Sequence, residues 1–142
     1  MRGLICGPAA TAAAAALISL VPAPPALSQP IDCSQAFSTV ELSVCAREEL
    51  ERKDQQLKQA MQQLAADAAA IPGNFAAIWS DSLTDFFKTS TDPLQQYEAF
   101  RAARSNACVY MNSLSVQGTG FGIFTANCEI KLTNVLLEKL GH

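Results

Sequence analysis

The chain has 142 residues, which is enough for one small domain once an export signal at its front end is set aside. Its formal net charge is −3. This acidic composition argues against a nucleic-acid-binding protein and against attachment to anionic membrane surfaces. The elements that follow are taken in chain order.

The first 28 residues have the three parts of a secretory signal peptide. A short basic start at residues 1–3 precedes an uncharged, alanine-rich run over residues 4–21. Prolines break the run, and Ala26-Leu27-Ser28 places small residues where a signal peptidase reads them. We therefore expect cleavage before Gln29 and a mature domain of residues 29–142, periplasmic or secreted. The alternative, an uncleaved membrane anchor, is disfavoured because so many alanines, with a glycine and a proline, make the run marginal for spanning a bilayer.

The mature chain is more acidic than the full sequence. Removal of residues 1–28 takes away Arg2 and no acid, so nine Lys and Arg remain against thirteen Asp and Glu, and the formal charge is −4. Such a domain would be steered towards a basic partner.

Four cysteines remain after one of the five leaves with the signal: Cys33, Cys45, Cys108 and Cys128. An even count in a small exported chain indicates a disulfide framework, for which three connectivities are open. We favour Cys33–Cys45 and Cys108–Cys128, since each bond would tie the start of a helical block to the segment beside it, although the sequence does not decide among the three. A four-cysteine zinc site is the alternative, but there is no Cys-x-x-Cys pair and the only histidine is the last residue. We expect no metal and no cofactor.

Hydrophobic periodicity predicts helices and no strand, and hence a small all-α bundle. Ser38 lies three residues before Glu41, the spacing of a capping box, so a helix should begin there. An Ile-Pro-Gly-Asn turn ends it, and Asp92 followed by Pro93 marks another helix start. The four expected helices cover residues 39–69, 74–88, 93–111 and 123–140, with a glycine-containing loop over residues 112–122.

Apolar residues at helical spacing mark the faces that we expect to be buried. The first helix has a long apolar stripe, the second has an aromatic face that should be core, and the fourth has one apolar side. These stripes include Val40, Leu57 and Leu64; Phe75, Ile78, Trp79, Leu83, Phe86 and Phe87; and Phe124, Cys128, Leu132, Val135 and Leu136.

Two charged residues interrupt the apolar stripes. Asp54 lies between Leu50 and Leu57 in the first helix, and Arg104 lies between Phe100 and Cys108 in the third. A charge in such a position is costly unless it is paired, so we hypothesise an ion pair between Asp54 and Arg104. The alternative is that each side chain reaches solvent at the edge of its stripe.

No catalytic residue can be assigned. A serine hydrolase needs a base beside its nucleophile, but the chain has only its terminal histidine and no Gly-x-Ser-x-Gly sequence. A thiol enzyme needs a free cysteine, whereas all four have expected partners. We therefore predict a protein that is not an enzyme.

Residues 32–140 resemble the lysozyme-inhibitor LprI-like domain, a family of small exported bacterial domains. The resemblance is carried by Cys33, Thr39, Glu41, Cys45, Asp54, Leu57, Arg104, Cys108, Cys128, Leu132 and Thr133. The chain departs from the family pattern at Lys58, Met61, Phe100, Ser105 and Leu136.

This resemblance implies a helical exported protein that binds and inhibits lysozyme. The charges agree with such a partner, because animal-type lysozymes are basic hydrolases and the mature chain is acidic. The alternative is an exported adaptor or structural protein for a different envelope partner. A salt-sensitive complex with lysozyme would distinguish the inhibitor from the adaptor.

Overall fold

The computed structural model describes residues 31–142, so the predicted signal peptide, residues 1–28, lies outside the described residues. Within this range the chain forms four α-helices and no strand, which confirms the all-α fold. The α-helices are α1 (Thr39–Ala70), α2 (Phe75–Asp81), α3 (Pro93–Met111) and α4 (Phe121–Lys139). A π-helical turn, η1 (Ser82–Phe86), continues α2, and a 3₁₀ turn, η2 (Ser113–Ser115), follows α3.

Helix α1 begins at the predicted cap. The Ser38 hydroxyl accepts a hydrogen bond from the Glu41 backbone N–H at 3.2 Å, and the Glu41 carboxylate accepts one from the Ser38 N–H at 3.0 Å. Each side chain thus satisfies a first-turn donor that the helix itself leaves free. The helix ends at Ala70 because Pro72 holds the residue before it in an extended conformation.

The cap predicted for α3 is also present, whereas α4 starts earlier than expected. Asp92 accepts a hydrogen bond from the Leu94 N–H at 2.9 Å, with Pro93 in the first helical turn. Helix α4 begins at Phe121, two residues before the predicted start, after Gly120, which provides no side-chain cap. Without a capping side chain the sequence carried no signal for that boundary.

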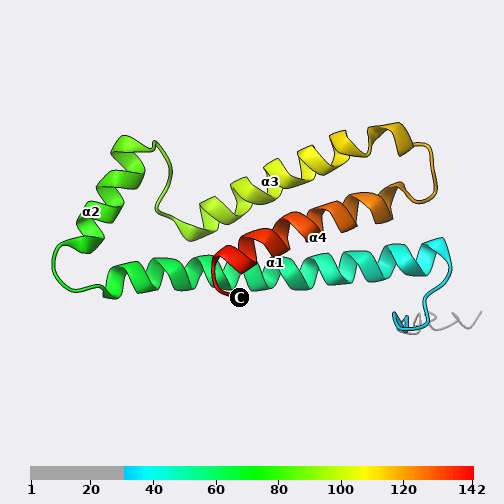
Figure 1. Ribbon diagram of the computed structural model, residues 1–142, viewed down its shortest axis with the longest axis horizontal. Helices are drawn as coiled ribbons and strands as arrows, with labels where there is room; N and C mark the ends of the chain where they lie inside the picture. The colour runs from blue at the N-terminus through cyan, green and yellow to red at the C-terminus, as the bar shows by residue number, and fades with distance from the viewer. Residues whose placement is uncertain (1–30) are drawn as a thin grey trace, which may run out of the picture.

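Helix α1 is the base on which α3 and α4 pack (Figure 1). It has 32 residues against 19 in each of the other two, so it is about 48 Å long and they are about 28 Å long. Its most extensive contacts are with α4 and then with α3. The length difference leaves the last turns of α1 beyond the three-helix core, and α2 turns back from that end (Figure 1).

The hydrophobic core lies where the three long helices meet. Leu57 and Ala60 from α1, Tyr97 from α3 and Leu137 from α4 form its centre. Four half-buried side chains pack around them: Met61, Phe100, Leu136 and Leu140.

Three expectations about burial were wrong. Val40 and Leu64 lie in the predicted stripe of α1 but are exposed, since α3 and α4 do not cover both ends of this long helix. The predicted aromatic core of the second helix is largely solvent-exposed, because α2 packs mainly on one of the three long helices, α1. In α4 the buried face is rotated from the predicted one: Phe124 and Val135 are exposed, and the buried residues are Ala126, Glu129, Thr133 and Leu137.

Candidate functional site

The polar centre of the molecule is a buried pair formed by the two residues that interrupt the apolar stripes. Asp54 of α1 faces Arg104 of α3, and the two side chains are 7% and 2% exposed. The guanidinium donates from both terminal nitrogens, at 2.5 Å to Oδ1 and 3.1 Å to Oδ2. This two-pronged geometry is the strongest arrangement for an arginine and a carboxylate, and it fixes the register of α1 against α3.

A second acid from α4 completes the pair. Glu129 Oε2 accepts a hydrogen bond from Arg104 Nε at 3.0 Å, and Thr133 Oγ1 accepts one from Arg104 Nη1 at 2.6 Å. The Thr133 hydroxyl in turn donates to the Glu129 carbonyl at 2.9 Å. A single guanidinium therefore holds three helices together, and we call Asp54, Arg104, Glu129 and Thr133 the buried network.

Sequence reasoning missed Glu129 as a member of this network. The residue follows Cys128 and lies four before Thr133, so a signal was present: one helix face carrying an acid and a hydroxyl among small or apolar neighbours. The predicted apolar stripe, which includes Phe124 and Val135, implied that the face with Glu129 points to solvent. Only the position of Arg104 in the structure shows that this face of α4 points inwards.

Arg101 sits at the edge of the network. Its Nε donates to Asp54 Oδ2 at 3.0 Å and its Nη1 to Glu98 at 3.2 Å, while its side chain is 44% exposed. Two arginines thus face Asp54 and Glu129, and the formal charges cancel. Each guanidinium also lies over an aromatic ring, Arg101 over Tyr97 at 5.4 Å and Arg104 over Phe100 at 5.5 Å.

The electrostatics of the network favour the charged form of Arg104. Burial by itself lowers the pKa of Arg104, but the hydrogen bonds and charge of Asp54, with the charge of Glu129, outweigh it and raise that pKa overall. Burial first, and then the charge of Asp54, raises the pKa of Tyr97 above its ordinary value. Within residues 31–142 every buried side-chain nitrogen and oxygen has a hydrogen-bond partner. The arrangement suits a clamp between helices, since its buried polar groups are bonded to one another across α1, α3 and α4.

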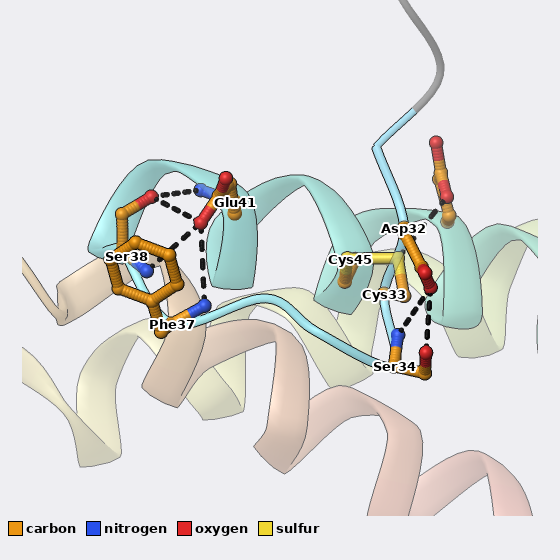
Figure 2. The surroundings of a disulfide bond; sticks show 8 residues. Asp32, Cys33, Ser34, Phe37, Ser38, Glu41 and Cys45 are labelled. Atoms are coloured by element: carbon orange, nitrogen blue, oxygen red, sulfur yellow. Dashed lines mark hydrogen bonds between the residues drawn. A yellow bond between two sulfur atoms is a disulfide. The ribbon is translucent and has the colours of Figure 1, made fainter.

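One disulfide reinforces the clamp by joining α3 to α4, and the other ties the lead-in segment to α1. Cys33 is bonded to Cys45 and Cys108 to Cys128, the connectivity favoured from the sequence. Figure 2 shows the Cys33–Cys45 bond tying the lead-in segment to α1, next to the capped first turn. The Cys108–Cys128 bond joins α3 to α4 one helical turn after Arg104 and one residue before Glu129. Each bond closes a short loop and contributes about 3 kcal/mol by the chain-entropy account.

The connection between α3 and α4 carries no charge. Residues 112–122 hold neither an acid nor a base, and Leu114 and Val116 are exposed there. Hydroxyl and amide groups of this loop can offer only neutral hydrogen bonds to a partner.

Two further features of the described chain bear on its class. No helix within residues 31–142 has the length and hydropathy needed to cross a membrane. In the same range, no group of three or more His, Cys, Asp and Glu side chains is placed to hold a metal ion.

Comparison with known proteins gives one family. The family described as "Lysozyme inhibitor LprI" matches residues 32–140, which is nearly all of the described chain. Comparisons with curated proteins and with solved structures each give no match.

Proposed function

Since the chain belongs to the lysozyme inhibitor LprI family, we propose that it is an exported binding protein that inhibits a lysozyme. The observation that carries the proposal is the extent of the family match, which includes both disulfides and every member of the buried network. The family description names an inhibitor, and inhibition of an enzyme requires a stable binding surface rather than catalytic groups.

Charge supports a basic target. The chain from Gln29 onwards has a formal charge of −4, so a basic hydrolase would be attracted to it at low ionic strength. The rigid helical frame supports the proposal as well. A surface held by two disulfides and a three-helix clamp loses little conformational entropy on binding.

Export follows from the same proposal. A lysozyme acts on the cell wall, outside the cytoplasm, and disulfides of this kind persist in oxidising compartments. We propose that residues 1–28 direct the chain to the periplasm or the exterior and are removed there. N-terminal sequencing of the exported protein tests the point, with Gln29 expected as the first residue and Met1 as the contradicting result.

The test of inhibition uses the oxidised mature chain, residues 29–142, and an animal-type lysozyme. We expect saturable binding, a parallel loss of cell-wall lysis, and weaker binding as salt rises. A sample of the same chain that is reduced and alkylated with iodoacetamide is the matched control, because the neutral carbamidomethyl groups leave the formal charge unchanged and the sample lacks both disulfides. Binding without loss of lysis would instead favour an adaptor of the cell envelope.

A further inference from the structure

The most exposed aromatic pair of the described chain lies at the free end of the molecule. Phe86 and Phe87 are 79% and 65% exposed, and their rings meet edge to face with centroids 4.9 Å apart. They close η1, which lies at the far end of α1 from the uncharged loop between α3 and α4 (Figure 1). We call the segment from Asn74 to Pro93 the arm.

The wide turn η1 explains why these rings are not buried. In a continuous α-helix Phe86 would fall on the same face as Trp79 and Leu83, seven and three residues earlier. A π-turn takes more residues per revolution than an α-helix. The Phe87 N–H donates a hydrogen bond to the Ser82 carbonyl, five residues earlier, at 3.0 Å. Trp79 and Leu83 therefore remain against α1 while the phenylalanines turn away from that face.

The arm is held in place rather than frayed. Lys88 adopts the left-handed conformation, with φ of 54°, and ends the helix. The amide of Gln96 in α3 then donates to Thr89 Oγ1 at 2.6 Å and to the Ser90 carbonyl at 2.8 Å. The exposed pair is thus presented by a fixed backbone, which lowers the entropic cost of docking.

An apolar cavity lies at the base of the arm. It has a volume of about 320 Å³ and is formed where the arm meets α1 and the end of α4. Trp79 and Leu83 line it from the arm, and Met61 and Leu136 line it from the core. Leu83 and Thr89, which both line the cavity, flank Phe86 and Phe87 in the chain. A cavity of this size can accept an apolar anchor side chain of a partner.

Charge identifies the class of partner. The chain between Ala65 and Asp92 has four acids and one base, Lys88, giving it a formal charge of −3. All four acids, Asp67, Asp81, Asp85 and Asp92, are exposed. Within residues 31–142, no salt bridge involves any of them. At the end of α4, Glu138 and Lys139 add no net charge.

We infer that the arm is the docking face for a basic protein, which anchors an apolar side chain in the cavity and sets its cations against the four exposed acids of residues 65–92. A second copy of this chain fits poorly, because a two-fold contact would oppose two faces of the same negative charge. An anionic membrane surface is repelled for the same reason. The inference rests on the proposed function for the identity of that basic protein as a lysozyme.

The experiment compares two pairs of exposed apolar residues at opposite ends of the molecule. Phe86→Ser with Phe87→Ser alters the arm, and Leu114→Ser with Val116→Ser is the matched control in the uncharged loop. All four side chains are exposed, so both variants should keep the wild-type circular dichroism spectrum and thermal midpoint. For an animal-type lysozyme, we expect the arm variant to bind about tenfold more weakly or worse, and the loop variant to bind like wild type.

A second probe separates this inference from the proposed function. An amphipathic helical peptide of leucine and lysine, free of tryptophan, should shift the fluorescence of Trp79, the only tryptophan of the chain. The shift should be lost in the arm variant and should not occur with a peptide of leucine and glutamate. Asp81→Asn with Asp85→Asn should weaken binding at low salt and reduce its dependence on salt.

The outcomes are distinguishable. Lysozyme binding that is equal in the arm and loop variants overturns the inference and leaves the inhibitor proposal standing. Arm-dependent binding of the basic peptide without binding of lysozyme supports the docking face and overturns the inhibitor proposal. Binding of neither probe overturns both. Arm-dependent binding to anionic vesicles, or arm-dependent dimerisation in sedimentation, assigns the face to a membrane or to a second copy and overturns the inference.

Discussion

Replacement of Arg104 by methionine should be among the most destabilising single changes in the described chain. The methionine keeps much of the side-chain length but removes four hydrogen bonds, which leaves Asp54 and Glu129 as buried carboxylates without their main partner. Breaking a buried ion pair in this way typically costs 3–5 kcal/mol, so we expect a loss of about 4 kcal/mol. A domain of this size is stable by roughly 5–15 kcal/mol, so this loss would be a large fraction of its total stability.

A matched control exists three residues earlier. Arg101→Met removes the same type of side chain and a hydrogen bond to the same acid, Asp54, but Arg101 is 44% exposed. Its loss should cost less than about 1 kcal/mol, because solvent screens the exposed Arg101 charge and Asp54 keeps both of its hydrogen bonds from Arg104. The contrast between the two arginines isolates burial as the cause of the larger effect.

The triple variant Asp54→Leu, Arg104→Met, Glu129→Met completes the set of variants to be compared. It replaces the charged members of the network with apolar side chains, and Thr133 keeps its hydrogen bond to the Glu129 backbone carbonyl. Such exchanges are often neutral or stabilising, so the triple variant should regain most of the stability lost in Arg104→Met. Urea unfolding of the oxidised proteins, followed by circular dichroism and extrapolated linearly, measures each free energy. The reasoning is refuted if Arg104→Met costs no more than Arg101→Met, or if the triple variant is less stable than Arg104→Met.

Three further predictions concern the cap of α1, Tyr97 and the two disulfides. The pKa of Glu41 is lowered by its hydrogen bonds with the Ser38 backbone and side chain, so the stability it provides is present above pH 4.5 and lost as pH falls through the lower, folded-state value. The unfolding free energies of wild type and Glu41→Gln, measured over an acid titration, should therefore converge at low pH. A constant difference between the two would contradict this prediction. Burial and the charge of Asp54 raise the pKa of Tyr97, so its contribution is complete below pH 10 and declines as pH rises through the raised value. Ultraviolet titration of wild type and Tyr97→Phe should assign to Tyr97 an ionisation above its ordinary pKa, and Tyr97→Phe should unfold at higher pH than wild type; equal alkaline unfolding midpoints would contradict this prediction. Reduction of both disulfides should lower the unfolding free energy by about 6 kcal/mol, about 3 kcal/mol for each bond, which unfolding in a reducing buffer measures; an unchanged midpoint would show that the bonds carry no stability.

The sequence predicted those helix boundaries that side-chain chemistry defines. Ser38 and Glu41 form a cap from residues three apart, and Asp92 with Pro93 does the same for α3, so local spacing was sufficient. Gly120 has no capping side chain, and the start of α4 was misplaced by two residues. The π-turn at Ser82 has no sequence signature of the kind that periodicity detects, and its effect on Phe86 and Phe87 could not be foreseen.

Burial was less predictable than helix formation, because it depends on which elements meet. The spacing of Asp54 and Arg104 indicated a charge within each of two apolar stripes, and the structure brings the two charges together. Glu129 could be recognised only from the orientation of α4 relative to Arg104. The aromatic stripe of α2 shows the same limit, since an apolar face indicates that something should cover it and does not say whether the same chain does so.

The most direct test of this account is one titration of an animal-type lysozyme with the oxidised mature chain, in which binding and cell-wall lysis are followed together at low salt. The account predicts saturable binding with a matching loss of lysis, and a curve for the Phe86→Ser, Phe87→Ser variant displaced about tenfold to higher concentration. Undiminished lysis in the presence of a folded, disulfide-bonded wild-type chain at saturating concentration would contradict it.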